Sequence, residues 1–151
     1  MPLVGEWEPG TADWATKQVK AFEASDGREA NTLRGVPVVV VTMAAKSEGV
    51  LRKVPVMRVE HGGEYAVVAS KGGAPEHPAW YHNIVRDPHV ELQDGGVRRD
   101  YVAHVADGAN RDAWWERAVA VWPDYAEYQT KTDRQIPVFV LTPVTDSPTA
   151  G

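Results

Sequence analysis

The stretch 69–83 has the residue types of a ligand-binding turn. It reads Ala-Ser-Lys-Gly-Gly-Ala-Pro-Glu-His-Pro-Ala-Trp-Tyr-His-Asn and follows an apolar, β-branched run. Two adjacent glycines allow a flat or anionic ligand to approach the backbone closely, because no side chain intervenes. Pro78 suits the first turn of a helix, whose free N–H groups attract anions. A plain strand-to-helix connection explains the same residues equally well, since Gly-Gly turns are common.

A second set of candidate residues is cationic. Between Lys46 and Arg58 the chain carries four basic side chains and one acidic side chain, although its net charge is −5. Within this stretch, Lys46, Ser47, Arg52 and Lys53 could bind a phosphate or carboxylate tail. The alternative is a solvated hairpin edge whose lysines protect against aggregation.

A third set is aromatic. Trp122, Tyr125 and Tyr128 are spaced three residues apart, in a chain that contains six tryptophans and five tyrosines. Their rings lie on one side if the chain stays nearly helical across Pro123. Such rings serve a planar cofactor or an aromatic substrate, and an ordinary aromatic core is the alternative.

The composition excludes several classes of site and partner. The 151 residues are 43% apolar, which predicts a single domain with one sizeable core. The absence of cysteine excludes disulfides and thiolate catalysis and fits a cytoplasmic location. His77 and His82 lack a helical metal-ligand spacing, so we assign no metal. The acidic net charge argues against nucleic acid as a partner.

The chain also lacks an apolar stretch of the roughly 20 residues that a spanning helix needs. We therefore expect any membrane contact to be weak and peripheral, at the inner face of the cell membrane. A homodimer is compatible with the sequence.

The elements that must position these residues are a helix and a β-rich body. Residues 1–10 are expected to form an arm, and 11–26 a helix capped by Thr11 and ended by Gly27. This helix should pack on a sheet or barrel, with a lid or a membrane-surface contact as the alternative. Residues 36–143 should hold the barrel and further helices, and 144–151 a loose tail. Strands are expected at 36–42, 51–60, 65–70, 90–94, 97–106 and 136–142, and later helices at 111–121, capped by Asn110, and 125–132, capped by Asp124.

Several separate motifs together resemble one family. They are Val-Val-Ala-Ser-Lys-Gly-Gly-Ala-Pro-Glu-His-Pro-Ala-Trp-Tyr-His-Asn, the earlier Lys-Ser pair, Pro-His-Val-Glu-Leu-Gln-Asp-Gly, and Tyr-Ala-Glu-Tyr-Gln-Thr-Lys-Thr-Asp-Arg-Gln-Ile-Pro-Val. In order and spacing they resemble the deazaflavin-dependent nitroreductase and quinone reductase family of actinobacteria, over residues 38–143. The resemblance implies an α+β, mainly β, split β-barrel with peripheral helices. It also implies the coenzyme F-420, an 8-hydroxy-5-deazaflavin.

Position by position, the resemblance assigns the coenzyme site. The phosphate and acidic tail would be bound by Lys46, Ser47, Arg52 and Lys53. The deazaflavin ring or its linker would be bordered by Ala69, Ser70, Lys71, Gly72 and Gly73, and the short helix that follows would be supported by Trp80 and Asn83.

The resemblance also assigns the acceptor site. One wall would be formed by Trp122, Tyr125 and Tyr128, and the proton that the acceptor needs would come from Ser70, Tyr125 or water. The chain departs from the family pattern at three places. Ala44-Ala45 stands where a glycine usually precedes the Lys-Ser pair, Glu48 looks inserted, and Trp122 replaces a tyrosine.

The activity that the resemblance implies is hydride transfer from reduced coenzyme F-420 to a small electrophilic acceptor. Quinones, nitroaromatics and activated enones form the expected acceptor class. Two alternatives remain open at the level of sequence. One is an FMN-binding split-barrel reductase, and the other is a non-catalytic deazaflavin carrier.

Overall fold

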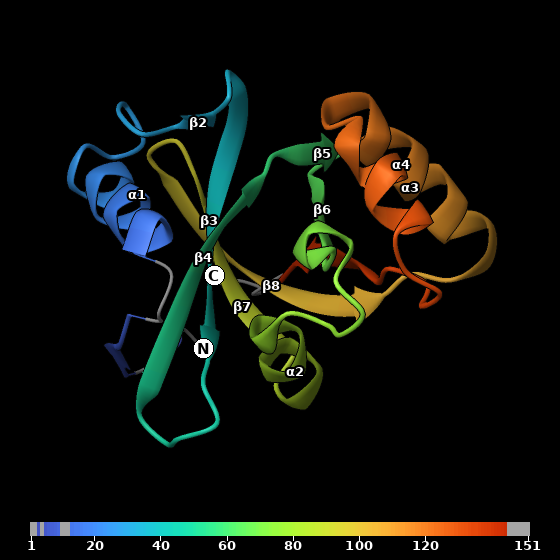
Figure 1. Ribbon diagram of the computed structural model, residues 1–151. Helices are drawn as coiled ribbons and strands as arrows, with labels where there is room; N and C mark the ends of the chain where they lie inside the picture. The colour runs from blue at the N-terminus through green and yellow to red at the C-terminus, as the bar shows by residue number, and fades with distance from the viewer. Residues whose placement is uncertain (1–2, 4, 10–12, 145–151) are drawn as a thin grey trace.

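The computed structural model describes residues 3, 5–9 and 13–144. Within these residues the strands join into one curled sheet in the order β1-β4-β3-β7-β8-β9-β6-β5, with β2 paired to β3 (Figure 1). The strands are β1 (Glu6–Trp7), β2 (Thr32–Leu33), β3 (Val36–Ala44), β4 (Val50–Met57), β5 (Val59–His61), β6 (Glu64–Val68), β7 (His89–Asp94), β8 (Val97–Val105) and β9 (Val138–Pro143). The helices are α1 (Asp13–Ala24), the 3₁₀ turn η1 (Lys71–Gly73), α2 (Ala79–Arg86), α3 (Gly108–Val121) and α4 (Asp124–Thr130).

Strand β3 lies at the centre of the packing. It pairs antiparallel with β4 on one side and with β7 on the other. Val39 and Val41 face the barrel interior, whereas Val38 faces the cluster under α3 and α4, and Val40 packs against α1. Because both faces of β3 are covered, the run of β-branched residues reads as continuously apolar, which confirms the predicted buried strand.

The barrel closes where the chain changes partner after β4. The predicted single strand 51–60 is wrong, because the chain divides at Arg58, whose backbone N–H donates to the Pro37 carbonyl oxygen at 2.9 Å. Before this point β4 pairs with β3, and after it β5 pairs with β6. Gly62 and Gly63 form the turn between β5 and β6, with φ values of +60° and +86°.

Helix α1 packs against the sheet, as predicted for the helix at 11–26. Val19 and Phe22 are fully buried, in one cluster with Val40 of β3. Gly27 ends this region as predicted, since its N–H donates to the Phe22 carbonyl oxygen at 2.8 Å and its φ is +76°. The predicted cap Thr11 lies outside the described residues, as does most of the predicted tail.

Helices α3 and α4 cover the opposite side of the sheet (Figure 1). The predicted cap at Asn110 is wrong, because the Arg111 N–H already donates to the Asp107 carbonyl oxygen at 3.1 Å, so α3 begins earlier. The predicted cap at Asp124 is also wrong, since Pro123, with φ −57°, precedes the first residue of α4. Within the described part of the chain, no helix is long and apolar enough to cross a membrane.

Candidate active site

A large apolar cavity lies between the barrel and its helices. Its volume is about 610 Å³, and it is bounded by β4, the turn η1, the start of α2, α4, α1 and the β2–β3 turn. Six residues predicted for the coenzyme or acceptor come together in its lining: Ser70, Lys71, Trp80, Trp122, Tyr125 and Tyr128. Residues far apart in sequence therefore meet around one space.

A second, smaller cavity continues the first. Its volume is about 380 Å³, and it shares Ala15, Val54 and Trp80 with the larger cavity. Its lining includes the cationic side chains of Arg52 and Lys53. The two cavities together form one cleft that is apolar and aromatic at one end and cationic at the other.

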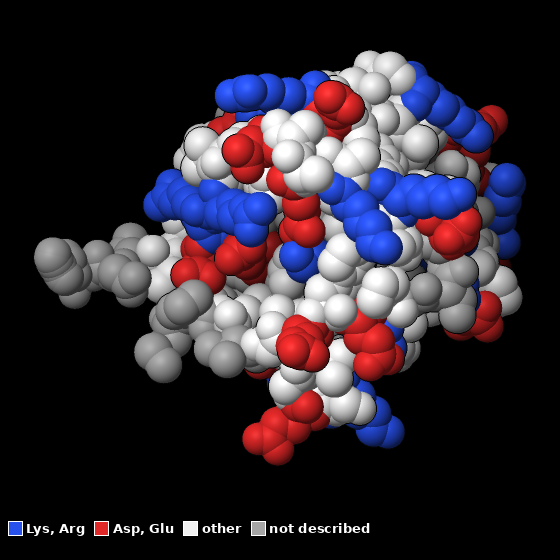
Figure 2. All heavy atoms as spheres, turned by 90° about the vertical axis from the view of Figure 1, so that its left-hand side faces the viewer, with Lys and Arg blue, Asp and Glu red and all other residues white. Residues whose placement is uncertain are grey.

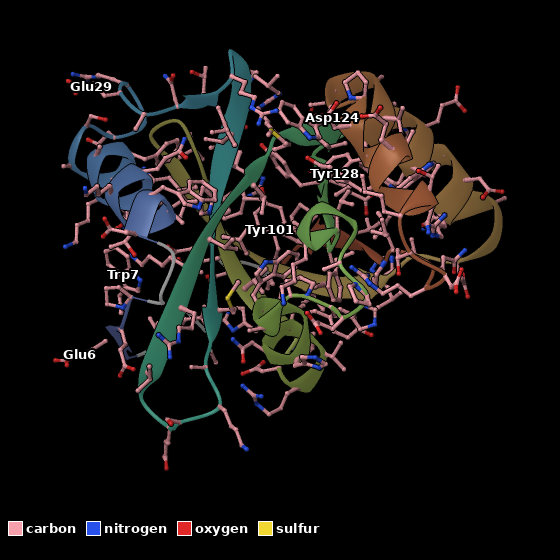
Figure 3. The ribbon with its side chains drawn as sticks, viewed as in Figure 1. Glu6, Trp7, Glu29, Tyr101, Asp124 and Tyr128 are labelled. Carbon is pink, nitrogen blue, oxygen red and sulfur yellow. The ribbon has the colours of Figure 1, made fainter. Side chains whose placement is uncertain are left out.

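The aromatic end is built at the junction of α3 and α4. Trp122 has φ −136° and ψ 89°, so α3 ends there and the chain is not continuously helical across Pro123. The three rings nevertheless gather: Trp122 Nε1 points to the Tyr128 hydroxyl at 3.5 Å, and the Tyr125 and Tyr128 rings meet edge to face at 6.1 Å. Figure 3 shows Tyr128 on the side of α4 that faces the barrel.

Tyr125 is the most enclosed hydroxyl of this wall. Its side chain is 6% exposed, and it packs beside Trp115 with ring centroids 6.4 Å apart. Burial raises the pKa of Tyr125 well above its ordinary value, and the neighbouring Tyr128 adds to the shift. The hydroxyl is therefore protonated at neutral pH, and Tyr125 is one of the residues that line the cavity.

The turn η1 brings Ser70 and Lys71 to the cavity. Strand β6 ends at Val68, and the Gly73 N–H donates to the Ser70 carbonyl oxygen at 2.9 Å. Gly73 has φ +84°, and a Cβ there would lie 2.6 Å from the Tyr128 carbonyl oxygen. This glycine is thus required by the close packing of η1 on α4, a contact that sets the distance between the Ser70 turn and the aromatic wall.

Other residues of the predicted ring segment occupy different positions. Ala69 is fully buried in the cluster that fills the barrel interior, and it does not line either cavity. Gly72 lies within η1, between Lys71 and Gly73. Trp80 lines both cavities and packs against Phe139 at a ring distance of 6.3 Å.

At the cationic end, Arg52 and Lys53 already have intramolecular partners. Arg52 Nη1 donates to the backbone carbonyl oxygens of Glu8 at 2.7 Å and Pro9 at 3.1 Å. Lys53 pairs with Glu23 of α1, and its ammonium lies 5.2 Å from the centre of the Trp7 ring. On the face that carries α1, basic and acidic side chains are intermixed rather than separated (Figure 2).

Lys46 and Ser47 are not brought into the cleft. Both are exposed in the turn between β3 and β4, and neither lines the two cavities. The turn extends beyond the paired part of this hairpin, whose last paired residues are Ala44 and Leu51. No group of three metal-ligating side chains was found among the residues that the structure describes.

Arg34 and Trp14 are lining residues that the motifs did not assign. Arg34 has φ +51°, stacks on the Trp122 ring at 5.5 Å and pairs with Asp124 at 3.7 Å. Trp14 of α1 is 57% exposed at the edge of the larger cavity. An exposed tryptophan early in a helix is the only sequence signal that could have suggested the position of Trp14.

The cleft fits a deazaflavin coenzyme in size and in chemistry. Cofactor sites commonly have volumes of about 300–1,000 Å³ and apolar linings with few polar groups, and the larger cavity has about 610 Å³. A planar ring matches the end lined by Trp80, Tyr125 and Tyr128. An anionic tail matches the end that contains Arg52 and Lys53.

Comparison with known proteins agrees with this fit. The family model for F420H(2)-dependent quinone reductase matches residues 14–143. The F420H(2)-dependent quinone reductase of Mycobacterium tuberculosis is 32% identical over 128 residues, which are 80% of this chain and 84% of that protein. The predicted coenzyme and enzyme class are therefore confirmed.

Two solved structures extend the comparison to the fold. An F420-H2 dependent reductase, FDR-A, is 51% identical with a TM-score of 0.67, over 70% of this chain and 93% of its own. A protein described as a domain-swapped dimer is 45% identical with a TM-score of 0.70, over 85% of this chain and 97% of its own. They confirm the predicted split-barrel fold, and the chain belongs to the F420H(2)-dependent quinone reductase family.

Proposed function

We propose that the protein transfers hydride from reduced coenzyme F-420 to quinones, and to nitroaromatics and activated enones as well, within the cleft between α4 and η1. The observation that carries this proposal is the joining of an aromatic cavity to a cationic one through Trp80. A single ligand with a planar ring and an anionic tail satisfies both ends. The family to which the chain belongs supports the quinone as acceptor.

Arg52 and Lys53 bind the phosphate and carboxylates of the coenzyme tail. A guanidinium offers five N–H donors, so Arg52 can retain a bond to the Glu8 carbonyl oxygen while it donates to a phosphate oxygen. Lys53 lies deeper, since its side chain is 14% exposed and paired with Glu23. Arg52 therefore supplies the larger and more adjustable share of the binding.

Reduced coenzyme F-420 supplies a hydride when bound, because the carbon in place of the flavin nitrogen favours two-electron transfer. The acceptor then carries an additional electron pair and needs one proton. Tyr125, which lines the cavity, is the first candidate for the group that orients or protonates the acceptor. Ser70, also in the lining, is the second candidate.

The remaining aromatic residues shape the acceptor space and exclude water. Trp122 and Tyr128 complete the wall beside Tyr125. Trp14, which belongs to α1, also lines the cavity. Indole in place of the family's usual phenol at position 122 adds bulk and removes a hydroxyl. This substitution is expected to alter the preference among acceptors rather than the coenzyme.

The proposal extends to assembly as a homodimer. It is supported by the 45% identical relative described as a domain-swapped dimer. Light scattering of the purified protein across a concentration series tests it, and a mass of one chain throughout would contradict it.

An anaerobic assay tests the proposed activity. Purified protein is mixed with reduced coenzyme F-420 and either menadione, a nitroaromatic or an activated enone, and the return of the oxidised coenzyme's absorbance is followed. We expect protein-dependent oxidation with a quinone and with at least one acceptor of each other class. Tight coenzyme binding without turnover of any acceptor would instead identify a carrier.

A further inference from the structure

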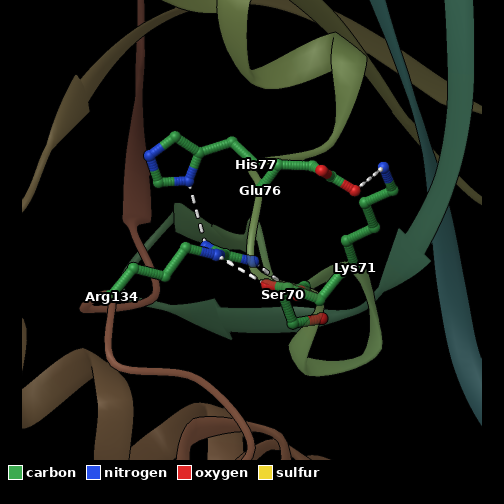
Figure 4. Close-up of polar contacts among 6 residues, drawn as sticks. Ser70, Lys71, Glu76, His77 and Arg134 are labelled. Atoms are coloured by element: carbon green, nitrogen blue, oxygen red, sulfur yellow. Dashed lines mark hydrogen bonds and ion pairs between the residues drawn. The ribbon is translucent and has the colours of Figure 1, made fainter.

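Arg134 joins two segments of the chain that lie far apart in sequence. It lies between α4 and β9, and its guanidinium reaches the segment 69–78, which connects β6 to α2 (Figure 4). Its Nη2 donates to the Ser70 carbonyl oxygen at 2.8 Å, and its Nε donates to the Ala74 carbonyl oxygen at 2.9 Å. Its Nη1 reaches the Ala69 carbonyl oxygen at 3.2 Å and His77 Nδ1 at 3.0 Å.

These four contacts surround the part of the segment that faces the cleft. Ser70 and Lys71 line the larger cavity, and so does Pro78, which directly follows His77. Backbone carbonyls inside a loop need partners when they are buried, and one planar guanidinium supplies several donors in a fixed arrangement. The path of the segment past the cavity therefore depends on one side chain from outside it.

His77 is the partner whose bond depends on pH. Its Nδ1 accepts a hydrogen bond from Arg134, which requires that nitrogen to be unprotonated. A proton on Nδ1 would remove the acceptor and place a second positive charge beside the guanidinium. The hydrogen bond between Arg134 and His77 is therefore lost in acid, whereas the other three contacts of Arg134 remain.

The surroundings of His77 favour its neutral form. Arg134, His82 and Tyr81 face its ring, with centroid distances of 6.2 Å to His82 and 4.1 Å to Tyr81. The nearby Glu76 is paired with Lys71 at 3.1 Å. Partial burial first, and then the charge of Arg134, lowers the pKa of His77. Its contribution to stability is present above the ordinary value of about 6.5 and is lost as the pH falls through the lowered value.

We propose that Arg134 is the positioning residue that holds segment 69–78 in its coenzyme-binding path, and that protonation of His77 weakens this hold. The consequence for coenzyme affinity rests on the proposed function, whereas the consequence for the order of the segment does not. The contacts of Arg134 all lie in segment 69–78, which includes the residues predicted to border the coenzyme ring, so its loss should weaken coenzyme binding.

Two measurements on the same variants test this proposal. Coenzyme affinity is measured by fluorescence titration at about pH 7.5 and about pH 5, the second value being set well below the ordinary histidine range because the pKa of His77 is lowered. Amide hydrogen exchange of segment 69–78, corrected for the intrinsic effect of pH, is measured without coenzyme. The variants are Arg134→Gln, Arg134→Lys and His77→Gln, with Arg58→Gln and His89→Gln as matched controls. Arg58 pairs with Asp94 and His89 pairs with Asp100, and none of these residues belongs to segment 69–78.

Arg134→Gln should weaken coenzyme binding by about tenfold or more, because charge-assisted bonds are lost, and should speed exchange in segment 69–78. Arg134→Lys should recover part of the affinity, since it restores the charge but not the planar set of donors. His77→Gln, whose amide oxygen still accepts, should bind normally at neutral pH and lose the acid-induced weakening. The control His89→Gln should keep the acid-induced weakening, and Arg58→Gln should leave coenzyme affinity and exchange in segment 69–78 unchanged.

The proposal is overturned if Arg134→Gln keeps both wild-type affinity and wild-type exchange, or if His77→Gln shows the same acid response as the wild type. Equal effects of Arg58→Gln and Arg134→Gln would also overturn it, because they would reduce the role of Arg134 to general stability. If the wild type binds no coenzyme at either pH, the proposed function fails, and the exchange data alone decide on the role of Arg134.

Discussion

The guanidinium of Arg52 donates a hydrogen bond to the backbone carbonyl oxygen of Glu8 at 2.7 Å, which links the cationic end of the cleft to the chain beside β1. The Glu8 carboxylate also lies 3.5 Å from Arg52 Nη2. Strand β1 pairs in parallel with β4, so this contact follows from the position of the N-terminal segment along β4. A coenzyme tail must therefore bind Arg52 in the presence of an acidic neighbour.

Arg52→Ala should weaken coenzyme binding by about 1.5–3 kcal/mol through the loss of charge-assisted hydrogen bonds, and less at high salt. Turnover at saturating coenzyme should hardly change, because Arg52 lies at the end of the cleft away from the aromatic wall. Fluorescence titration and steady-state kinetics measure the two effects. Arg98→Ala, which removes an exposed arginine of β8, is the control. Normal affinity together with reduced turnover would show that Arg52 is misassigned.

Glu8→Gln should have the opposite effect on affinity. The carboxylate competes with an anionic tail for Arg52, and exposed ion pairs are worth roughly 0.2–1 kcal/mol, so its removal should tighten coenzyme binding by about 1.4-fold to fivefold. Titration at low and high salt measures this, and the gain should shrink as salt increases. Glu6→Gln, a change in β1 two residues before Glu8, is the control. Weaker binding by the Glu8 variant would mean that the acidic group helps to form the site.

Tyr125→Phe should lower kcat/KM by about tenfold or more and leave coenzyme affinity within about twofold. The change keeps the buried ring and removes only the hydroxyl that can orient or protonate the acceptor. Kinetics with menadione and with a nitroaromatic measure the first effect, and coenzyme titration measures the second. Unchanged turnover with every acceptor would assign these rings to the core and move the search for the acceptor wall to α1 around Trp14.

Trp122→Tyr restores the family's usual residue and should change the ranking of acceptors while coenzyme affinity stays constant. The Trp122 ring lines the cavity and packs under Arg34 at 5.5 Å, so a smaller ring changes the space beside Tyr125. The ratio of kcat/KM for a bulky and a small quinone measures the effect. An identical ratio in both proteins would place Trp122 outside the acceptor space.

Features of the fold that depend on residues close together in sequence were easier to predict than features that depend on distant residues. The buried strand β3 was predictable because Val38 to Val41 are all covered, on both faces of the sheet. The end of α1 at Gly27 follows from a local hydrogen bond. The cap of α3 was misjudged because Asn110 and Asp107 are both good capping residues, and local propensity does not choose between them.

The sequence predicted which residues would form the candidate site, but not the contacts that hold them in place. The aromatic wall and Ser70 share one cavity, although the helix that was expected to align the rings is broken at Trp122. The contacts of Arg134 with segment 69–78 span 57 to 65 residues, and no local pattern reveals them. The neutralising partner of Arg52 was equally hidden, because it depends on the pairing of β1 with β4.

Binding of coenzyme F-420 in comparison with FMN tests the assignment of the joined cleft most directly. Both ligands offer a planar ring to the cavity at Trp80, but only the deazaflavin coenzyme has a longer anionic tail, which the proposed function assigns to Arg52 and Lys53 of the smaller cavity. Fluorescence titration of the wild-type protein with each ligand, under identical salt and pH, gives the two dissociation constants. We predict that coenzyme F-420 binds at least about tenfold more tightly, which corresponds to about 1.4 kcal/mol. Equal or tighter binding of FMN would contradict the assignment.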